Sequence, residues 1–305
     1  MDYSKLIDNE IWRFIRETDA HYPPDAVNRS AAQQREVYDN MCRAFFAGYP
    51  EGLEVRDQTI ETVPRRIYEP NEPKGTVVYF HGGGFVVGGL ESHDDVCAEI
   101  AYETGLRVVS ADYRLCPEHP HPAAFDDALT IVKYASLTWP RPLVLVGDSA
   151  GGNLAAASCH ALRGQVQIAG QVLIYPGLGG DMSEGSYVDH ANAPMLSMED
   201  LKFYSSIRFA TPPDGPDPTA APLEDTDFGD LPPTVSITAE CDPLADDGRT
   251  YRDAILGAGG KAVWFNETGL VHGYLRARHQ SERARHSFER ITQQITMLAR
   301  GEWHH

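Results

Sequence analysis

A serine lies between two glycines where an apolar run gives way to an alanine-rich stretch. Residues 144–152 read VLVGDSAGG and contain the spacing Gly147-x-Ser149-x-Gly151, with Asp148 and Ala150 flanking the serine. This spacing is typical of a nucleophile elbow, a tight strand-to-helix turn that exposes a serine hydroxyl and needs small residues on both sides. Ser149 is therefore a candidate nucleophile. On this motif alone a second reading stays open, in which the serine is a passive small residue in a helix-start turn.

Three consecutive glycines follow another short apolar run, in His81-Gly82-Gly83-Gly84. Acyl transfer requires N–H donors at the position where negative charge develops on the carbonyl oxygen, and glycines expose backbone amides that no side chain shields. We assign these donors to the N–H groups of Gly83 and Gly84, with Ala150 as the third. The alternative, a phosphate-binding loop, is disfavoured because neither GxxxxGK[ST] nor a complete GxGxxG is present.

A serine nucleophile needs a general base, and the base needs an acid that orients it. Asp242 follows a predicted strand and precedes Pro243, which disfavours helical geometry at the aspartate. His272 lies beyond the last predicted strand, between glycines that suit an exposed loop. The order serine, acid, histidine matches the order found in α/β-hydrolases. Other acids near Asp242 are alternatives: Glu240, Asp246 and Asp247, of which the last two suit the first turn of the next helix.

One further cluster contains residue types that bind metals. Glu118, His119 and His121 are neighbours in the chain, but prolines are interspersed among them and make the stretch a rigid turn. We therefore expect no metal site there. The chemistry assigned to the serine, histidine and aspartate requires neither a metal nor a cofactor.

Strand and helix patterns alternate through most of the chain, which predicts one α/β domain with a mainly parallel sheet and helices on both faces. Most of the predicted strands are rich in Val or Ile, which is typical of strands buried on both faces. The predicted strands are residues 76–80, 107–111, 143–146, 171–175, 234–238 and 262–265. The predicted helices are approximately residues 93–104, 122–137, 150–163, 246–258 and 281–299.

Three segments depart from this alternation. Residues 1–50 show helical spacing of apolar residues, and residues 54–68 are extended and predict an antiparallel strand pair at the sheet edge. Residues 181–231 contain no strand pattern; they include a helical stretch at 198–209 and a run rich in Pro and Asp at 211–230. That run has the composition of a linker, but predicted sheet strands lie on both sides of it. We therefore expect an ordered crossing within one domain.

Composition narrows the possible partners. The 305 residues carry 26 Lys and Arg against 44 Asp and Glu, a formal charge of −18, which argues against nucleic acid or an anionic membrane as partner. No uncharged apolar run is long enough for a spanning helix, and the N-terminus lacks a signal-peptide core. Five scattered cysteines without CxxC spacing do not suggest a disulfide scaffold. We expect a cytoplasmic protein without membrane insertion.

Together these motifs resemble the hormone-sensitive lipase family of α/β-hydrolases, in its bacterial esterase and lipase branch. The resemblance covers most of residues 60–295. Two positions differ from the common family pattern, Cys116 in place of Ala and Tyr274 in place of Phe. The resemblance rests on HGGG at 81–84, DYRLCPEHP at 112–120, GDSAGG at 147–152, DPL at 242–244 and HG at 272–273.

The resemblance implies an α/β-hydrolase fold with a mostly parallel eight-stranded sheet. It implies that residues 51–305 form the catalytic domain, covered by a helical cap built from residues 1–50 and an insertion at about 181–231. It also implies a Ser149–Asp242–His272 triad, hydrolysis of short- to medium-chain carboxylic esters of small molecules, and often a homodimer formed along one sheet edge.

Apolar residues of the two cap segments could line a pocket or could simply bury the cap against the sheet. These residues are Phe45, Phe46, Met195, Leu196, Met198, Phe203, Tyr204 and Phe209.

Two functional alternatives also stay open. One is hydrolysis of amides, carbamates or formamides with the same triad, and the other is a non-catalytic ligand-binding relative.

Overall fold

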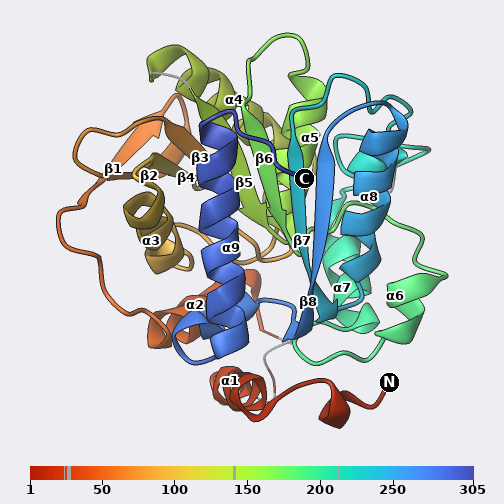
Figure 1. Ribbon diagram of the computed structural model, residues 1–305. Coiled ribbons are helices and arrows are strands. Elements are labelled where there is room, and N and C mark those ends of the chain that lie inside the picture. The colour runs from red at the N-terminus through yellow and green to blue at the C-terminus, as the bar shows by residue number, and fades with distance from the viewer. Residues whose placement is uncertain (24, 26–28, 140–141, 212) are drawn as a thin grey trace.

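A single eight-stranded sheet organises the chain (Figure 1). The computed structural model describes residues 1–23, 25, 29–139, 142–211 and 213–305. The strand order is β1-β2-β4-β3-β5-β6-β7-β8. The strands are β1 Glu54–Ile60, β2 Val63–Glu69, β3 Thr76–Phe80, β4 Arg107–Ala111, β5 Leu143–Asp148, β6 Gly170–Ile174, β7 Thr234–Cys241 and β8 Ala262–Val271.

The sheet is parallel from β4 to β8, while β1 and β2 form an antiparallel pair that joins β4. Successive side chains of a strand point to opposite faces. On β3, Val77 and Tyr79 belong to the core on one face, and Val78 and Phe80 belong to the core on the other. These four residues are fully buried, which confirms the predicted burial of the strand on both faces. The antiparallel pairing of β1 with β2 confirms the predicted strand pair at the sheet edge.

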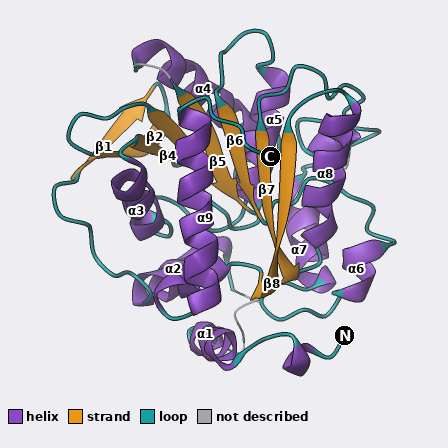
Figure 2. Ribbon diagram, viewed as in Figure 1, coloured by secondary structure: helices purple, strands orange, loops and turns teal. Residues whose placement is uncertain are grey.

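Helices cover both faces of the sheet (Figure 2). The helices α3 and α9 pack on one face, and α4, α5 and α8 pack on the other. The α/β-hydrolase fold class is therefore confirmed, and the predicted helices agree closely with the observed ones. Their bounds are α3 Asp94–Thr104, α4 Ala123–Thr138, α5 Ala150–Ala161, α8 Ala245–Gly257 and α9 Glu282–Ala299.

Two further groups of helices lie near the end of the sheet at which the parallel strands finish (Figure 1). One group belongs to the first fifty residues and the other to the segment between β6 and β7. Capping boxes begin α2, at Ser30 with Gln33, and α7, at Ser197 with Asp200. The helices are α1 Asn9–Asp19, α2 Ala31–Ala44, α6 Gly185–Asp189 and α7 Met198–Arg208, with 3-10 turns at Tyr3–Lys5, Pro222–Glu224 and Tyr274–His279.

The Pro- and Asp-rich run is an ordered crossing in its described part, which excludes residue 212. The amide N–H groups of Ala220 and Ala221 donate to the carbonyl of Asp217, and Leu223 donates to the carbonyl of Leu178 at 3.0 Å. Backbone bonds within the run and to the loop after β6 therefore hold it against the sheet. In the described ranges, none of the helices combines the length and apolar character needed to cross a membrane.

The last strand, β8, is longer than its apolar pattern predicted. It extends from the predicted residues 262–265 through Asn266, Glu267 and Thr268 to Val271. As an edge strand it is buried only in part, so polar side chains can occupy its exposed positions without ending the ladder. The added length places the residue after Val271, which is His272, beside the end of β7.

Candidate active site

Ser149 occupies the turn between β5 and α5. Its backbone has φ 54° and ψ −118°, and its N–H donates to the carbonyl of Ile174 at 2.8 Å. A Cβ on Gly147 would overlap the carbonyl of Gly151, and a Cβ on Gly151 would overlap the carbonyl of Phe80. The turn thus requires glycine at both positions, as the elbow spacing predicted.

A chain of hydrogen bonds joins Ser149 to His272 and Asp242. The Nε2 atom of His272 lies 2.9 Å from Oγ of Ser149, and its Nδ1 atom lies 2.7 Å from Oδ2 of Asp242. Asp242 is fully buried, and its Oδ1 accepts the N–H of Leu244 at 2.9 Å. The three residues follow the ends of β5, β7 and β8, which parallel pairing brings to the same edge of the sheet.

The other acids near Asp242 have different partners. Glu240 accepts the N–H of Gly269 at 2.7 Å, and Asp246 accepts the N–H of Ser186 at 2.9 Å. Asp247 accepts the N–H of Leu178 and the Tyr187 hydroxyl. Both aspartates lie in the first turn of α8, as expected, but their carboxylates fasten the segment after β6. Burial raises the pKa of Asp247 to about 6.

The triple glycine forms a loop beside Ser149. Gly83 and Gly84 have φ values of 129° and 61°, and a Cβ on Gly84 would overlap the ring of Tyr204. The carbonyl of Gly83 accepts the N–H groups of residues 86 and 87, which closes the turn. Within the described ranges, the N–H groups of Gly83, Gly84 and Ala150 have no hydrogen-bond partner. These three amides are thus free to bind an oxygen atom.

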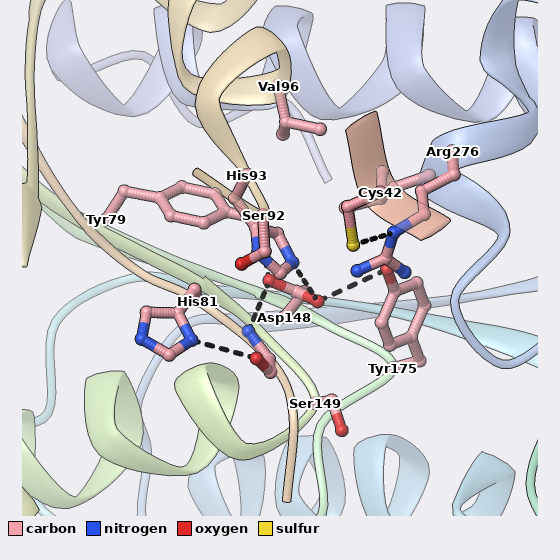
Figure 3. Close-up of polar contacts among 12 residues, drawn as sticks. Cys42, Tyr79, His81, Ser92, His93, Val96, Asp148, Ser149, Tyr175 and Arg276 are labelled. Carbon is pink, nitrogen blue, oxygen red and sulfur yellow. Dashed lines mark hydrogen bonds and ion pairs between the residues drawn. The ribbon is translucent and has the colours of Figure 1, made fainter. Parts of the chain in front are cut away.

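Asp148 connects this glycine loop to the elbow (Figure 3). Its Oδ1 accepts the Tyr79 hydroxyl at 2.8 Å and the N–H of Gly82 at 3.0 Å, and its Oδ2 lies 3.3 Å from Nε2 of His93 and 3.4 Å from the Tyr175 hydroxyl. Burial raises the pKa of this carboxyl, but His93 and the hydrogen bonds outweigh burial and lower the pKa overall. Asp148 is part of the GDSAGG motif, whereas no sequence signal pointed to His93.

His81 supports the loop from the other side. Its ring stacks on Tyr113 with centroids 4.2 Å apart, and its Nδ1 lies 2.8 Å from the carbonyl of Gly82. The Tyr113 hydroxyl donates to the carbonyl of His81 at 2.6 Å. Burial, with the nearby His93, lowers the pKa of His81 to about 3, so the ring is neutral. The neutral ring supports the glycine loop through its stacking on Tyr113 and its contact with the Gly82 carbonyl. Tyr113 belongs to the DYRLCPE segment, which explains why that segment accompanies the HGGG motif.

A cavity of about 480 Å³ opens onto Ser149 and His272. Its volume is in the range typical of small-molecule sites. Of the two roles left open for the apolar cap residues, lining the cavity holds for Met195, Leu196, Phe203, Tyr204 and Phe209. Phe45 instead packs on Phe14 in the core and Met198 packs beside Leu196, whereas Phe46 is exposed.

The candidate metal ligands point to separate partners. Glu118 pairs with Arg35 at 2.6 Å, and Nε2 of His121 lies 3.0 Å from Asp217 and from Thr219. Among the residues that the structure describes, no three metal-ligating side chains come together.

The chain matches a protein family described as "alpha/beta hydrolase fold" over residues 77–276, and it belongs to that family. This match, together with esterases among its relatives, confirms the resemblance to the hormone-sensitive lipase family. The chain is 36% identical over 233 residues to a carboxylesterase of Mycobacterium tuberculosis, NlhH, covering 70% of this chain and 71% of that protein. It is 33% identical over 229 residues to an ethyl acetate hydrolase of Pseudomonas putida, covering 70% and 72%.

Solved structures agree with this assignment. EstE1, a thermostable carboxylesterase cloned from a metagenomic library, superposes with a TM-score of 0.85 at 32% sequence identity. The superposition covers 90% of this chain and 99% of EstE1. The fold is therefore that of serine esterases.

Proposed function

We propose that this member of the α/β-hydrolase family is a serine carboxylesterase for short- to medium-chain esters, with Ser149 as nucleophile, His272 as general base and Asp242 as the orienting acid. The support is one geometric observation. The chain of hydrogen bonds from Asp242 through His272 to Ser149 ends beside three amides that, in the described ranges, are free, and all of these residues except Asp242 line one apolar cavity. The names of the relatives agree with this class of reaction.

In the first half-reaction, Nε2 of His272 takes the proton of Ser149 while Oγ attacks the ester carbonyl carbon. The carbonyl oxygen becomes an oxyanion, and the amides of Gly83, Gly84 and Ala150 bind it. The C–O bond to the alcohol then breaks, and the histidine returns the proton to the leaving oxygen. The product is an acyl-enzyme on Ser149.

In the second half-reaction, His272 takes a proton from water, and the hydroxyl attacks the acyl-enzyme carbonyl. The bond to Oγ of Ser149 breaks, the serine regains its proton, and the carboxylic acid leaves. Asp242 accepts the Nδ1–H bond throughout, which selects the productive tautomer and stabilises the imidazolium. The helices of residues 1–50 and 181–231 act as the cap, because their side chains line the cavity.

Replacing the nucleophile tests this function. Ser149→Ala should lower kcat/KM for 4-nitrophenyl butyrate by at least about a thousandfold with an unchanged melting temperature. Ser158→Ala is a matched control, because Ser158 is buried in the same helix α5 and its hydroxyl has no hydrogen-bond partner in the described ranges. Ester turnover near the wild-type rate in Ser149→Ala would refute the assignment.

The alternative function, amide hydrolysis, is tested by comparing kcat/KM for 4-nitrophenyl butyrate with kcat/KM for the butyryl anilide of the same acyl chain. An esterase should turn over the nitrophenyl ester far faster than the anilide, and the reverse order would favour the rival. A fluorophosphonate probe should label the wild-type protein and not Ser149→Ala; a wild-type chain that fails to react would favour a non-catalytic relative.

The proposal extends to a cytoplasmic location and a homodimer. The five cysteines are free and buried, as in a reducing compartment. The strand β8 ends the sheet and offers an edge for pairing with a second copy. Light scattering on the purified chain should give twice the monomer mass of 33.7 kDa, and a monomer at micromolar concentration would contradict the dimer.

A further inference from the structure

Two guanidinium groups lie among the residues that line the cavity, those of Arg208 and Arg276. In the described part of the chain, neither forms an ion pair with a carboxylate. A buried charge without a counter-charge is costly. We therefore compare the hydrogen bonds and the nearby charged groups of the two arginines.

Arg276 is satisfied from within the protein. Its Nε donates to Sγ of Cys42 at 3.2 Å, another nitrogen bonds to the Tyr38 hydroxyl, and its guanidinium stacks on the Tyr38 ring. Burial lowers the pKa of Arg276, but Cys42, Tyr38, Tyr175 and the Asp148 carboxylate outweigh it and raise the pKa well above its ordinary value. This arginine belongs to the polar network under the elbow (Figure 3).

Among the described residues, the hydrogen-bond partners of Arg208, the last residue of α7, are neutral. Its Nη1 donates to the carbonyl of Ala220 at 3.0 Å, its Nη2 donates to Oδ1 of Asn153 at 3.2 Å, and its guanidinium lies 3.8 Å from the ring centre of Phe85. Burial lowers the pKa of Arg208 to about 10, although Cys116, Asp217 and Tyr113 act in the opposite direction, so it remains charged at neutral pH. The Asp217 carboxylate forms its own hydrogen bonds, to His121 and Thr219. A guanidinium has five N–H donors, and two of them donate to residues that the structure describes.

The position of Arg208 relates it to the reacting atoms. Phe85 directly follows the glycine loop, and the N–H of Asn153 donates to the carbonyl of Ser149 at 3.1 Å. The guanidinium thus lies between the loop that would hold the oxyanion and the first turn of α5. Arg208 and Ser149 line the same cavity.

The carboxylates that line the cavity do not neutralise Arg208. Asp148 is engaged beneath the elbow, and Asp200 accepts the N–H and hydroxyl of Ser197 at the start of α7. Asp19, at the end of α1, forms no ion pair with a described residue, and burial raises its pKa. The remaining charged lining groups are Arg276 and, when protonated, His272.

We propose that the preferred substrates are esters that carry a free carboxylate, and that Arg208 is the specificity-determining residue that binds this carboxylate. The inference rests on the proposed esterase function and adds a substrate class to it. The planar guanidinium fork matches a carboxylate, and pairing inside a cavity is stronger than at an exposed surface. The free carboxylate supplies the direct ion pair that no described residue forms with Arg208.

The test compares charged esters with neutral esters of the same shape. On the acyl side, the pair is mono-4-nitrophenyl adipate and its methyl ester; on the alcohol side, it is 4-carboxyphenyl butyrate and its methyl ester. The readout is the ratio of kcat/KM for the charged ester to kcat/KM for the neutral one. The pair with the higher ratio identifies the side of the cavity that Arg208 serves, and Ser149→Ala gives the background rate.

In the wild type, at least one pair should have a ratio above one. Arg208→Gln should lower that ratio by about 10- to 100-fold, the size of a hydrogen-bonded charge pair, chiefly through KM. Arg208→Lys should lie between the two, because it keeps the charge and loses the fork. The control Arg285→Gln, whose arginine is exposed and pairs with Glu289 on α9, should leave the ratio unchanged.

Three outcomes would overturn the inference. They are a wild type that disfavours the charged ester of both pairs, an Arg208→Gln variant with an unchanged ratio, and an equal loss in Arg285→Gln. The wild-type ratios decide the matter even if Arg208→Gln does not fold. Failure of the esterase function itself would look different, because the neutral esters would then not be hydrolysed either.

Discussion

The carboxylate of Asp148 offers a sharp test of how the site is held together. The substitution Asp148→Asn keeps the shape of the side chain and replaces one accepting oxygen by an NH2 group. In the wild type each oxygen has two partners: Tyr79 and Gly82 on Oδ1, and Tyr175 and His93 on Oδ2. In either orientation of the amide, the NH2 group faces two partners of the oxygen that it replaces.

The magnitude follows from these hydrogen bonds. If the amide oxygen keeps the two shorter bonds, the NH2 group of the variant can no longer accept the hydrogen bonds at 3.3 and 3.4 Å. A hydrogen bond to a charged group contributes about 1.5–3 kcal/mol, and the longer distances favour the lower value, so the penalty is about 3 kcal/mol at pH 7. The alternative orientation also releases the N–H of Gly82, and kcat should then fall because the glycine loop shifts.

The penalty should depend on pH with a definite sign. The pKa of Asp148 is lowered in the folded protein, so its contribution is complete above the unfolded pKa of about 3.9 and declines as the pH falls below it. At pH 3 the wild type should have lost about 1 kcal/mol of this advantage over the variant, because each unit corresponds to about 1.4 kcal/mol.

Urea denaturation at pH 7 and pH 3 measures both quantities, with Asp253→Asn as the control. Asp253 is exposed and, among the described residues, pairs with its neighbour Arg252, so this control should change the free energy of unfolding by less than about 0.5 kcal/mol. A penalty for Asp148→Asn below about 1 kcal/mol at pH 7, or one that grows at pH 3, would refute the reasoning.

Three more substitutions probe the remaining features. Asp242→Asn should lower kcat about ten-thousandfold, because an amide no longer selects the Nδ1–H tautomer of His272; steady-state kinetics would check this, and a loss below about tenfold would contradict it. Gly151→Ala should destabilise by more than about 2 kcal/mol in thermal unfolding, because its Cβ would overlap a backbone carbonyl, whereas Gly257→Ala has open space and should not. Burial raises the pKa of Asp247 to about 6, so its stabilising contribution is complete below about pH 4 and lost above pH 6; between pH 4 and 7 the wild type should lose about 3 kcal/mol relative to Asp247→Asn in urea titrations, and parallel curves would exclude this.

Local patterns were sufficient for the α/β-hydrolase sheet and for the candidate triad. Buried strands need continuous apolar runs, and a nucleophile elbow needs glycines at fixed offsets, so both leave short-range signatures. The loop before Pro243 and the one after β8 could be located because each follows a strand end. The full length of β8 could not, since its exposed edge accepts polar residues such as Asn266 and Glu267.

The amino-acid sequence by itself determined the fold class, the family and the order of Ser149, Asp242 and His272. Only the tertiary structure decided which charges are compensated, because counter-charges come from distant segments. It is the packing of β3 and the loop after it, of the residue before α3 and of the residue after β6 that surrounds the Asp148 carboxylate with its partners. The same packing leaves Arg208 among neutral groups in the cavity, although along the chain it is only the last basic residue of a helix.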